Sequence, residues 1–316
     1  MSVAQRAVRI REVGPRDGFQ NEPERIPTGD KVRLIEALAR SGLRRIEVAS
    51  FVRPDVIPQL DDGIEVLRSV RLPADVELMV LIPNMRGLDR ALEVRDRFHE
   101  AVIFVSASET HNRHNVNRTV AESMASNDAV TARISAEGLR CAAVIATAFG
   151  CPYEGRVPME RVFALAERFV EAGAVEIGFG DTTGMGNPAY VRDFFAAAAQ
   201  RLPGVELTAH FHNTRGQGLA NAYAAWESGC ESFEASFGEL GGCPVPPGAT
   251  GNVATEDLVS MFHEMGISTG VSLPDLISAA RAVQDLLGRR LTSHSIIAGP
   301  IAWEPVGSGN LRGAHT

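Results

Sequence analysis

Two histidines separated by one residue, His210 and His212, are the side chains whose type and spacing point most directly to chemistry. The run around them, Leu207–Phe211, is rich in apolar residues and predicts a β-strand. Residues two apart on a strand face the same side, so both imidazoles would be aimed at one point. A single His-x-His pair can also be a polar cluster in a protein core. The residues that the fold brings beside the pair must therefore distinguish a functional site from a structural one.

Two oxygen-bearing side chains could complete a metal site with these histidines. Asp17 comes just after the first apolar run of the chain, Val8–Val13, and Asn252 lies in a glycine-rich stretch that starts at Gly248. Two imidazoles and two hard oxygens suit a divalent metal that keeps open coordination positions, such as Mg²⁺ or Mn²⁺. Taken alone, Asp17 is better interpreted as a turn residue, because it stands between an arginine and a glycine.

The elements that must position these residues recur along the chain. Between most of the apolar runs lie segments with helical spacing, such as Lys31–Arg40 and Arg161–Val170. Strands alternating with helices at a period of roughly 25–40 residues predict an α/β fold, the TIM (β/α)8 barrel. A doubly wound sheet shares this alternation, but Gly178–Gly184 lacks the Gly-x-Gly-x-x-Gly spacing of a dinucleotide site. The predicted strands are Val8–Val13, Arg45–Ala49, Glu77–Ile82, Val102–Ser106, Ala142–Ala146, Val175–Phe179, Leu207–Phe211 and Ser232–Phe237.

The C-terminal part of the chain is expected to add helices to this barrel. One helix begins near Thr255, which could cap it, and Ser272–Leu287 predicts another. We therefore expect a catalytic barrel with C-terminal helices over residues 1–290 and a loosely ordered tail over residues 291–316.

Polar residues collect where the predicted strands end. In a barrel, all of these positions face one mouth, which is where active sites form. In another fold the same residues would be ordinary loop residues with no common role. The whole set is therefore stronger evidence for an active site than any one residue in it. They are Arg16, Asp17, Glu47, Ser50, Asn84, Ser108, Glu109, Asp181, Thr182, His210, His212 and Cys243.

Composition excludes several classes of partner. The formal net charge of −8 argues against a nucleic-acid backbone or an anionic membrane as the main partner. The sequence has no apolar stretch of transmembrane length, and its start lacks the apolar segment of a signal peptide. Its four cysteines show neither a disulfide framework nor a Cys-x-x-Cys pair, so a reduced cytoplasm is expected.

Lysine usage removes several mechanisms. Lys31 is the only lysine, and its surroundings predict the start of a surface helix rather than the end of a strand. A Schiff-base aldolase, a pyridoxal-phosphate enzyme or a carbamylated-lysine site needs a lysine at its centre. The Gly-Lys-Ser/Thr sequence of a P-loop and the Gly-x-Ser-x-Gly elbow are also absent. Carbonyl chemistry here must therefore be activated by a metal.

Seven motifs in order resemble those of the 3-hydroxy-3-methylglutaryl-CoA lyases, within a wider group of metal-dependent TIM-barrel lyases and condensing enzymes. The similarity runs from about Val8 to Leu287. It is specific for the group and less specific for the substrate. The motifs are Glu12–Glu22, Ile46–Val52, Phe149–Gly155, Gly180–Gly184, Ala209–Asn213, Leu240–Pro244 and Gly251–Leu258.

The resemblance implies a retro-Claisen cleavage. A 3-hydroxy-3-alkyl acyl-CoA would lose its C3 hydroxyl proton and break its C2–C3 bond, leaving a ketone and the enolate of acetyl-CoA. A metal would act as Lewis acid on the C3 oxygen, a base would take the proton, and a cation would stabilise the enolate. A homo-oligomer, such as a dimer, is also expected.

Residue roles follow from the same resemblance. Asp17, His210, His212 and Asn252 match the metal ligands, and His210 is also expected to act in catalysis. Arg16 matches the cation at the enolate, although a structural salt bridge with Glu47 is an alternative and both can hold. Cys243, in a glycine-rich loop, matches the residue that protonates the enolate, whereas Cys151 is expected only to pack. Glu47 and Asp181 would orient these groups or the substrate. The expected substrate contacts are Gln20, Ser50, Asn84 and Glu256, although capping of a helix start explains Glu256 nearly as well.

Several positions depart from the lyase pattern. Gly178 stands where the family usually has serine, and Asn213 and Arg215 stand where it has aspartate and tyrosine. In the cysteine loop, Gly238 and Glu239 replace alanine and glycine, and Val245 replaces an aromatic residue. These changes surround the expected mouth rather than the metal, so they suit a different or larger acyl-CoA, such as citramalyl-CoA. A second histidine pair, His111 and His114, either lines the mouth near the CoA phosphates or belongs to a solvated loop.

Other classes remain as alternatives. A condensing synthase would share the metal histidines, but it would usually lack the Gly-Gly-Cys-Pro loop and carry a long C-terminal region. A metal-dependent aldolase acting without CoA fits the metal but not the cysteine loop. A non-catalytic barrel would have discarded the ligands, so we rank it last.

Overall fold

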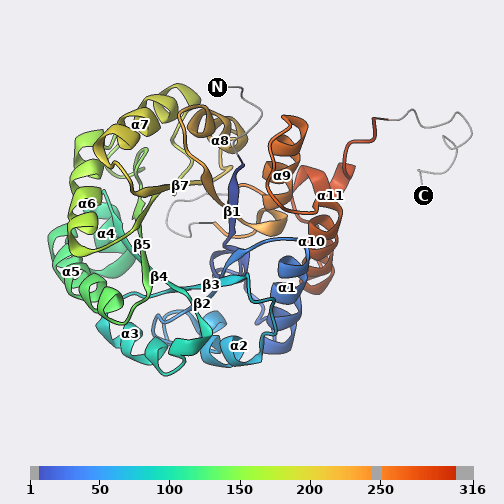
Figure 1. The fold of residues 1–316 in the computed structure, drawn as a ribbon, viewed down its shortest axis with the longest axis horizontal. Coiled ribbons are helices and arrows are strands. Elements are labelled where there is room, and N and C mark those ends of the chain that lie inside the picture. Colours follow the sequence, from blue (N-terminus) through green and yellow to red (C-terminus); the bar gives the residue numbers. More distant parts are fainter. Residues whose placement is uncertain (1–6, 243–250, 304–316) are drawn as a thin grey trace, which may run out of the picture.

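The predicted strands form and close into a barrel in the computed structural model, which describes residues 7–242 and 251–303 (Figure 1). All neighbouring strands are parallel, and β8 pairs with β1, so the TIM-barrel prediction is confirmed. The strands are β1 (Arg9–Glu12), β2 (Arg45–Ser50), β3 (Glu77–Leu81), β4 (Glu100–Ser106), β5 (Arg140–Ala146), β6 (Glu176–Asp181), β7 (Glu206–Phe211) and β8 (Ser232–Ala235).

The helices surround this barrel and cover the outer faces of the strands (Figure 1). They are α1 (Thr28–Arg40), α2 (Gly63–Ser69), α3 (Met85–Leu92), α4 (Glu109–Val116), α5 (Val120–Ala136), α6 (Met159–Ala172), α7 (Pro188–Arg201), α8 (Gly218–Glu227), α9 (Thr255–Glu264), α10 (Leu273–Leu287) and α11 (His294–Ala298). Short helical turns lie at η2 (Gly14–Gly18), η3 (Pro58–Leu60), η4 (Arg95–Arg97) and η5 (Phe237–Glu239). Within the described residues, none of these helices combines the length and apolar character that crossing a bilayer requires.

The main core lies between strands and helices, where alternate residues of each strand point outward. A cluster of aromatic rings, including Phe163, Phe179 and Phe194, packs α6 and α7 against β6. Inside the barrel, the residues nearest the N-terminal ends of the strands are charged, and Arg11 and Arg45 both pair with glutamates there. The interior therefore changes from an ion-pair network at that end to the polar and apolar walls of the site at the other.

Lys31 corrects one expectation. Its side chain is buried rather than on the surface, because η3 and the start of α2 cover the first turn of α1. The ammonium donates to the carboxylate of Asp62 at 2.7 Å and to the carbonyl oxygen of Gln59. Since α1 lies outside the barrel, Lys31 still does not stand at the centre of the site (Figure 1).

Two expectations for the C-terminal part also need correction. Thr255 does not cap α9, because its hydroxyl donates to the buried Glu12 Oε2 at 2.7 Å, and Ala254 precedes the helix instead. Packed structure also continues past residue 290. The carboxylate of Asp257 accepts from the backbone nitrogens of His294 and Ser295, so α9 holds the start of α11.

Candidate metal centre

His210 and His212 face each other at the C-terminal end of β7. Their Nε2 atoms lie 3.1 Å apart, and both side chains line the large cavity at the mouth of the barrel. His210 ends the inward-facing row of β7, while His212 lies just beyond the strand and forms a bridge with Asn252. The strand periodicity thus aims both rings at one point.

Asp17 reaches the same point from η2, a single π-helical turn after β1. The backbone nitrogens of Asp17 and Gly18 both donate to the carbonyl of Val13, which tightens the chain directly after the strand. Gly14 is required there, because a Cβ would collide with the Phe237 ring. One ligand atom from each of Asp17, His210 and His212 lies within 4.8 Å of the others.

Asn252 completes the group. Its Nδ2 donates to Asp17 Oδ2 at 2.7 Å and to the carbonyl of Leu240 at 3.2 Å. Its Oδ1 is buried and, among the described residues, has no hydrogen-bond partner. A buried acceptor normally has a partner. A carboxylate, an amide oxygen and two imidazole nitrogens that converge as acceptors therefore fit a divalent cation.

Charge around this point favours an ionised Asp17. Burial would raise the pKa of its carboxyl, but Arg16, His210 and the amide of Asn252 outweigh burial and hold the pKa below the usual value. Burial likewise lowers the pKa of His210, but the adjoining Glu234 carboxylate outweighs it and raises the pKa. The ionised Asp17 carboxylate thus supplies negative charge that a bound cation would need.

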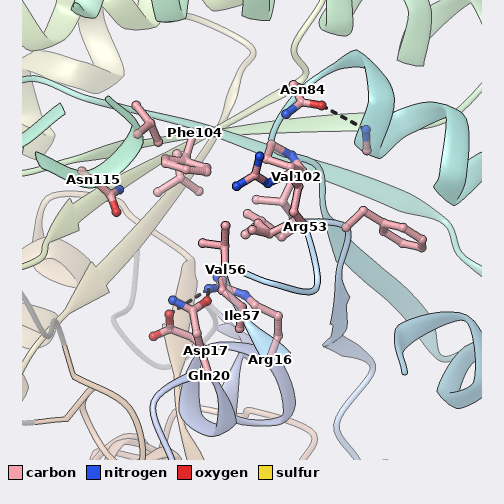
Figure 2. A pocket seen from close by; sticks show the side chains of 18 of the residues that line it. Arg16, Asp17, Gln20, Arg53, Val56, Ile57, Asn84, Val102, Phe104 and Asn115 are labelled. Atoms are coloured by element: carbon pink, nitrogen blue, oxygen red, sulfur yellow. Dashed lines mark hydrogen bonds and ion pairs between the residues drawn. The ribbon is translucent and has the colours of Figure 1, made fainter. Parts of the chain in front are cut away.

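Arg16 lies beside Asp17 and makes the expected salt bridge with Glu47. Its Nε donates to Glu47 Oε2 at 2.7 Å, and its Nη1 donates to Asp17 Oδ1 at 2.8 Å. Nη1 also lies 3.4 Å from Gln20 Oε1. Figure 2 shows the side chains of Arg16, Asp17 and Gln20 grouped at the edge of the cavity. Burial raises the pKa of Glu47 to about 7 although Arg16 opposes this.

Four further residues expected at the site lie in different surroundings. Asn84 lines the cavity, but its Oδ1 caps α3 by accepting from the nitrogen of Gly87 (Figure 2). Asp181 follows the inward-facing Gly180, so it turns away from the cavity and accepts from the nitrogens of Met185 and Gly186.

Ser50 and Glu256 are both buried and neither lines the cavity of the described residues. Ser50 Oγ lies 3.4 Å from the nitrogen of Val52, within its own turn. Glu256 Oε1 accepts from the nitrogen of Gly238 at 2.8 Å, and burial raises its pKa to about 8. These contacts favour structural roles over direct contact with a substrate.

Cys243 lies outside the described residues. The chain leading to it passes close to the metal centre, because a Cβ on Gly241 would approach Asn252 Nδ2 to 2.7 Å. Gly241 also has a φ of +97°, which glycine adopts without strain. Cys151 is fully buried, and its backbone pairs with that of Gly155.

The departures from the lyase pattern have local partners. Arg215 donates to the carbonyls of Thr183 and Gly184, and Glu239 accepts from Asn213 Nδ2 at 2.8 Å. Glu239 adopts a φ of +60°, the backbone conformation for which glycine is suited. The place of a Cβ on Gly178 lies 3.1 Å from the side chain of Val144, which fills part of the room that glycine leaves.

The cavity has a volume of about 1590 Å³ and extends from the histidines to an arginine-bearing mouth. Its lining includes Val102 and Phe104 of β4 and Arg53 of the segment that follows β2 (Figure 2). His111 and His114, on α4, both line it. His111 is buried, while His114 stacks on Tyr153 with ring centroids 5.0 Å apart.

Glu234 was missed by the sequence analysis. This residue of β8 lines the cavity, and its Oε2 lies 2.9 Å from Nδ1 of His210. Its other oxygen accepts from Arg11 Nε at 3.3 Å. The sequence did contain a signal that could have identified Glu234, because it is an acidic residue at an inward-facing position of a predicted strand.

Known proteins share both the sequence and the fold. The model of the HMGL-like family matches residues 7–283. The chain belongs to the HMGL-like family. It is 45% identical over 294 residues to the hydroxymethylglutaryl-CoA lyase YngG of Bacillus subtilis, covering 92% of this chain and 96% of that protein. It is 41% identical over 305 residues to the (R)-citramalyl-CoA lyase of Chloroflexus aurantiacus, covering 93% of this chain and 96% of that protein.

Among solved structures, an HMG-CoA lyase from Acenitobacter baumannii in complex with coenzyme A and 3-methylmalate is 40% identical, with a TM-score of 0.91. That comparison covers 97% of this chain and 100% of the other. The hydroxymethylglutaryl-CoA lyases match over most of the chain, which makes this protein a carbon–carbon lyase, and its Asp17, His210 and His212 cluster could hold a metal ion. The expected family and class of reaction are thereby confirmed.

Proposed function

We propose that this HMGL-like protein cleaves 3-hydroxy-3-methylglutaryl-CoA, or a close 3-hydroxyacyl-CoA, into acetyl-CoA and a keto acid such as acetoacetate. The observation that carries the proposal is the convergence of Asp17, His210 and His212 beside the guanidinium of Arg16 in one cavity. Asn252, with its unpartnered Oδ1, would be the fourth ligand. The oxygen-rich donor set suits Mg²⁺ or Mn²⁺.

The bound cation would polarise the C3 oxygen of the substrate and lower the pKa of its hydroxyl. Glu47 is suited to take the hydroxyl proton, because it lines the cavity and its Oε1 has no hydrogen-bond partner among the described residues. Its pKa of about 7 matches that of a base working near neutral pH.

Arg16 would stabilise the enolate that remains after the C2–C3 bond breaks. Its guanidinium stays charged through the reaction, and Glu47 and Asp17 hold it in one orientation at the cavity edge. Cys243 would then return a proton to the enolate carbon to give acetyl-CoA. This last role rests on the motif resemblance.

The outer part of the cavity suits coenzyme A. Three arginines, Arg53, Arg86 and Arg90, line it, although the chain as a whole carries a net charge of −8. A local cluster of guanidinium groups is the chemistry that binds phosphates. The C. aurantiacus relative is an (R)-citramalyl-CoA lyase, and the A. baumannii relative was solved in complex with coenzyme A.

Citramalyl-CoA is the second candidate substrate. The observation that favours it is the 41% identity to the (R)-citramalyl-CoA lyase of C. aurantiacus. Cleavage of citramalyl-CoA by the same reaction would give acetyl-CoA and pyruvate. The two thioesters therefore leave distinguishable keto acids.

We also infer a cytoplasmic protein, which the three described cysteines support because all are free thiols. The homodimer stays a prediction, which light scattering of the purified protein tests.

The deciding experiment offers both thioesters to protein stripped of metal by a chelator, with and without Mg²⁺ or Mn²⁺. Acetyl-CoA and acetoacetate released from hydroxymethylglutaryl-CoA only with metal, and lost in His210→Ala and Cys243→Ala, would support the main proposal. Release of pyruvate from citramalyl-CoA at a much higher kcat/KM would select the second substrate. Cleavage of neither thioester by folded, metal-loaded protein would reject both.

A further inference from the structure

The carboxylate of Glu234 lies between two nitrogen donors on neighbouring strands. Oε1 accepts from Arg11 Nε on β1 at 3.3 Å, and Oε2 lies 2.9 Å from His210 Nδ1 on β7. The register places Glu234 directly beside both partners, since it pairs with Arg11 on one side and with His210 on the other. The geometry of the barrel thus builds a three-residue contact across β1, β8 and β7.

Arg11 cannot release Glu234 easily, because other glutamates hold it. Its Nη2 donates to Glu100 at 2.7 Å, and its Nη1 pairs with Glu176. The side chain of Arg11 is 1% exposed and that of Glu234 is 7% exposed. The position of the Glu234 carboxylate is therefore set by the barrel interior and not by solvent.

A contribution to the stability of the fold does not explain well why these charged residues are buried here. Buried ion pairs often contribute little net stability, because desolvation of the charges offsets their attraction. Barrels of this type are usually filled by branched apolar residues at these positions. Glu234 contacts both the buried ion pairs and the candidate metal ligand His210. We therefore consider a role for Glu234 at the metal site.

The chemistry of the three groups fixes the proton on His210. Arg11 can only donate and an ionised carboxylate can only accept, so Glu234 Oε2 must accept a hydrogen bond from His210 Nδ1–H. A neutral imidazole protonated at Nδ1 keeps its lone pair on Nε2. That atom faces His212 Nε2 at 3.1 Å, in the place of the candidate metal.

We propose that Glu234, anchored by Arg11, is a positioning residue that holds His210 in the Nδ1–H form and orientation needed to bind the metal. The inference rests on the metal site of the proposed function. It gives the ion-pair network inside the barrel a task at the active site. The Glu234 carboxylate would also make the imidazole a stronger ligand.

The Glu234→Gln variant separates this role from simple packing. A glutamine has one oxygen and one amide nitrogen, and so it cannot accept from both Arg11 and His210. If its oxygen stays with Arg11, its NH₂ faces His210 Nδ1 and drives the imidazole proton to Nε2, where it blocks the metal. The replacement has nearly the same volume, so packing changes little.

Glu206 provides the matched control within the same network. Its carboxylate accepts from Arg45 at 2.9 Å and from Arg140 at 3.1 Å, and in the described part of the chain it forms no hydrogen bond with His210. Glu206→Gln therefore removes a network charge without altering the imidazole. Thermal unfolding of both variants reports any loss of stability.

Two readouts that need no substrate test the inference. The first is Mn²⁺ binding, followed by the electron paramagnetic resonance of free Mn²⁺. We expect Glu234→Gln to weaken binding by roughly 10- to 100-fold, the range typical of lost partners behind metal-binding histidines, and Glu206→Gln to leave it unchanged. The second is the ¹⁵N spectrum of histidine-labelled, metal-free protein, with the His210 signals identified by the His210→Ala variant.

In that spectrum we expect His210 to be protonated at Nδ1 in the wild type and to shift toward Nε2 in Glu234→Gln. Unchanged Mn²⁺ affinity with an unchanged His210 spectrum would overturn the inference. Equal weakening by both variants would also overturn it, because the effect would then belong to network stability. A wild type that binds no Mn²⁺ would instead reject the proposed metal site and the inference with it.

Discussion

Asn252 donates from Nδ2 to Asp17 Oδ2 at 2.7 Å and so joins the turn after β1 to the segment that follows β8. The two residues are far apart in sequence but lie next to each other because β8 pairs with β1. The same Asn252 backbone forms a bridge with His212. One amide side chain therefore orients a neighbouring candidate ligand while leaving its own Oδ1 free for the metal.

Replacing Asn252 with alanine should weaken Mn²⁺ binding by about 10-fold or more, because one ligand is lost and Asp17 loses the donor that orients it. Titration of chelator-stripped protein with Mn²⁺ measures this. Asn221→Ala is the control, since Asn221 is equally buried, donates to the carbonyl of Gly186 and also has an unpartnered Oδ1 among the described residues. Equal affinity losses in the two variants would contradict a ligand role for Asn252.

Arg16→Lys should lower kcat much more than it changes KM. A lysine keeps the positive charge, but its single ammonium cannot reproduce the fork that contacts Glu47 and Asp17 together. Removal of one preorganised donor at a developing negative charge typically costs roughly 10²–10³-fold in kcat. Steady-state cleavage at saturating metal checks this.

Arg25→Lys makes a matched control for Arg16. Arg25 also lines the cavity, yet its side chain is 59% exposed and pairs with Asp61 instead of the metal centre. We expect kcat close to that of the wild type. A drop in kcat of similar size in both variants would mean that the cavity needs positive charge generally.

Much of the fold could be predicted because outward-facing strand residues are apolar and recur regularly. The predicted strand starts were less accurate, and they omit Glu100, Arg140 and Glu206 from strands that include them. These residues point into the barrel, where an apolar layer is expected, but here Glu100 and Glu206 form ion pairs with Arg140 and with Arg45. Such pairing depends on the register between strands distant in sequence, which periodicity alone does not supply.

The same limit applies to the site. Asp17, His210 and His212 could be grouped because each follows or ends a predicted strand, and such ends meet at one mouth. Glu234 was missed because only the register reveals that it lies beside His210. Asp181 was placed at the mouth by its position after a strand, but alternation turns it away from the cavity.

Glu12 should make stability depend on pH in a direction opposite to that of most carboxylates. Burial raises the pKa of its carboxyl from 4.5 to about 7, although Thr255 and two backbone nitrogens donate to it. Because ionisation is harder in the folded state, the free energy of unfolding falls as pH rises from 4.5 to about 7, then stays level. The loss is about 3 kcal/mol at most.

Glu12→Gln removes this charge while keeping an oxygen for the backbone donors, so its stability relative to the wild type should rise over the same pH interval. Thr255→Val, which removes one donor to the ionised carboxylate, should raise the folded-state pKa of Glu12 further and so extend the loss to higher pH. Denaturant unfolding across the interval measures both. A Glu12→Gln difference that is constant with pH would show that the carboxylate ionises equally in the folded and unfolded states.

Lys31→Met should destabilise the protein while leaving its chemistry intact. The side chains of Lys31 and Asp62 are only 2% and 6% exposed, so removing the ammonium leaves a largely covered carboxylate without its cation, a change that typically costs about 3–5 kcal/mol when the pair is buried. The Lys31→Met, Asp62→Leu double variant should recover much of that loss, because it removes both charges. Arg33→Met, at an ion pair whose arginine is 76% exposed, should change stability little.

The activity of Lys31→Met decides the class of mechanism. A lyase that forms a Schiff base on its only lysine would lose all cleavage, whereas metal-assisted cleavage needs no amine. We therefore expect kcat near that of the wild type at temperatures where the variant is folded. Complete loss of cleavage from folded Lys31→Met, together with trapping of substrate on the wild type by borohydride, would reject the metal-centred mechanism and place the reaction at α1.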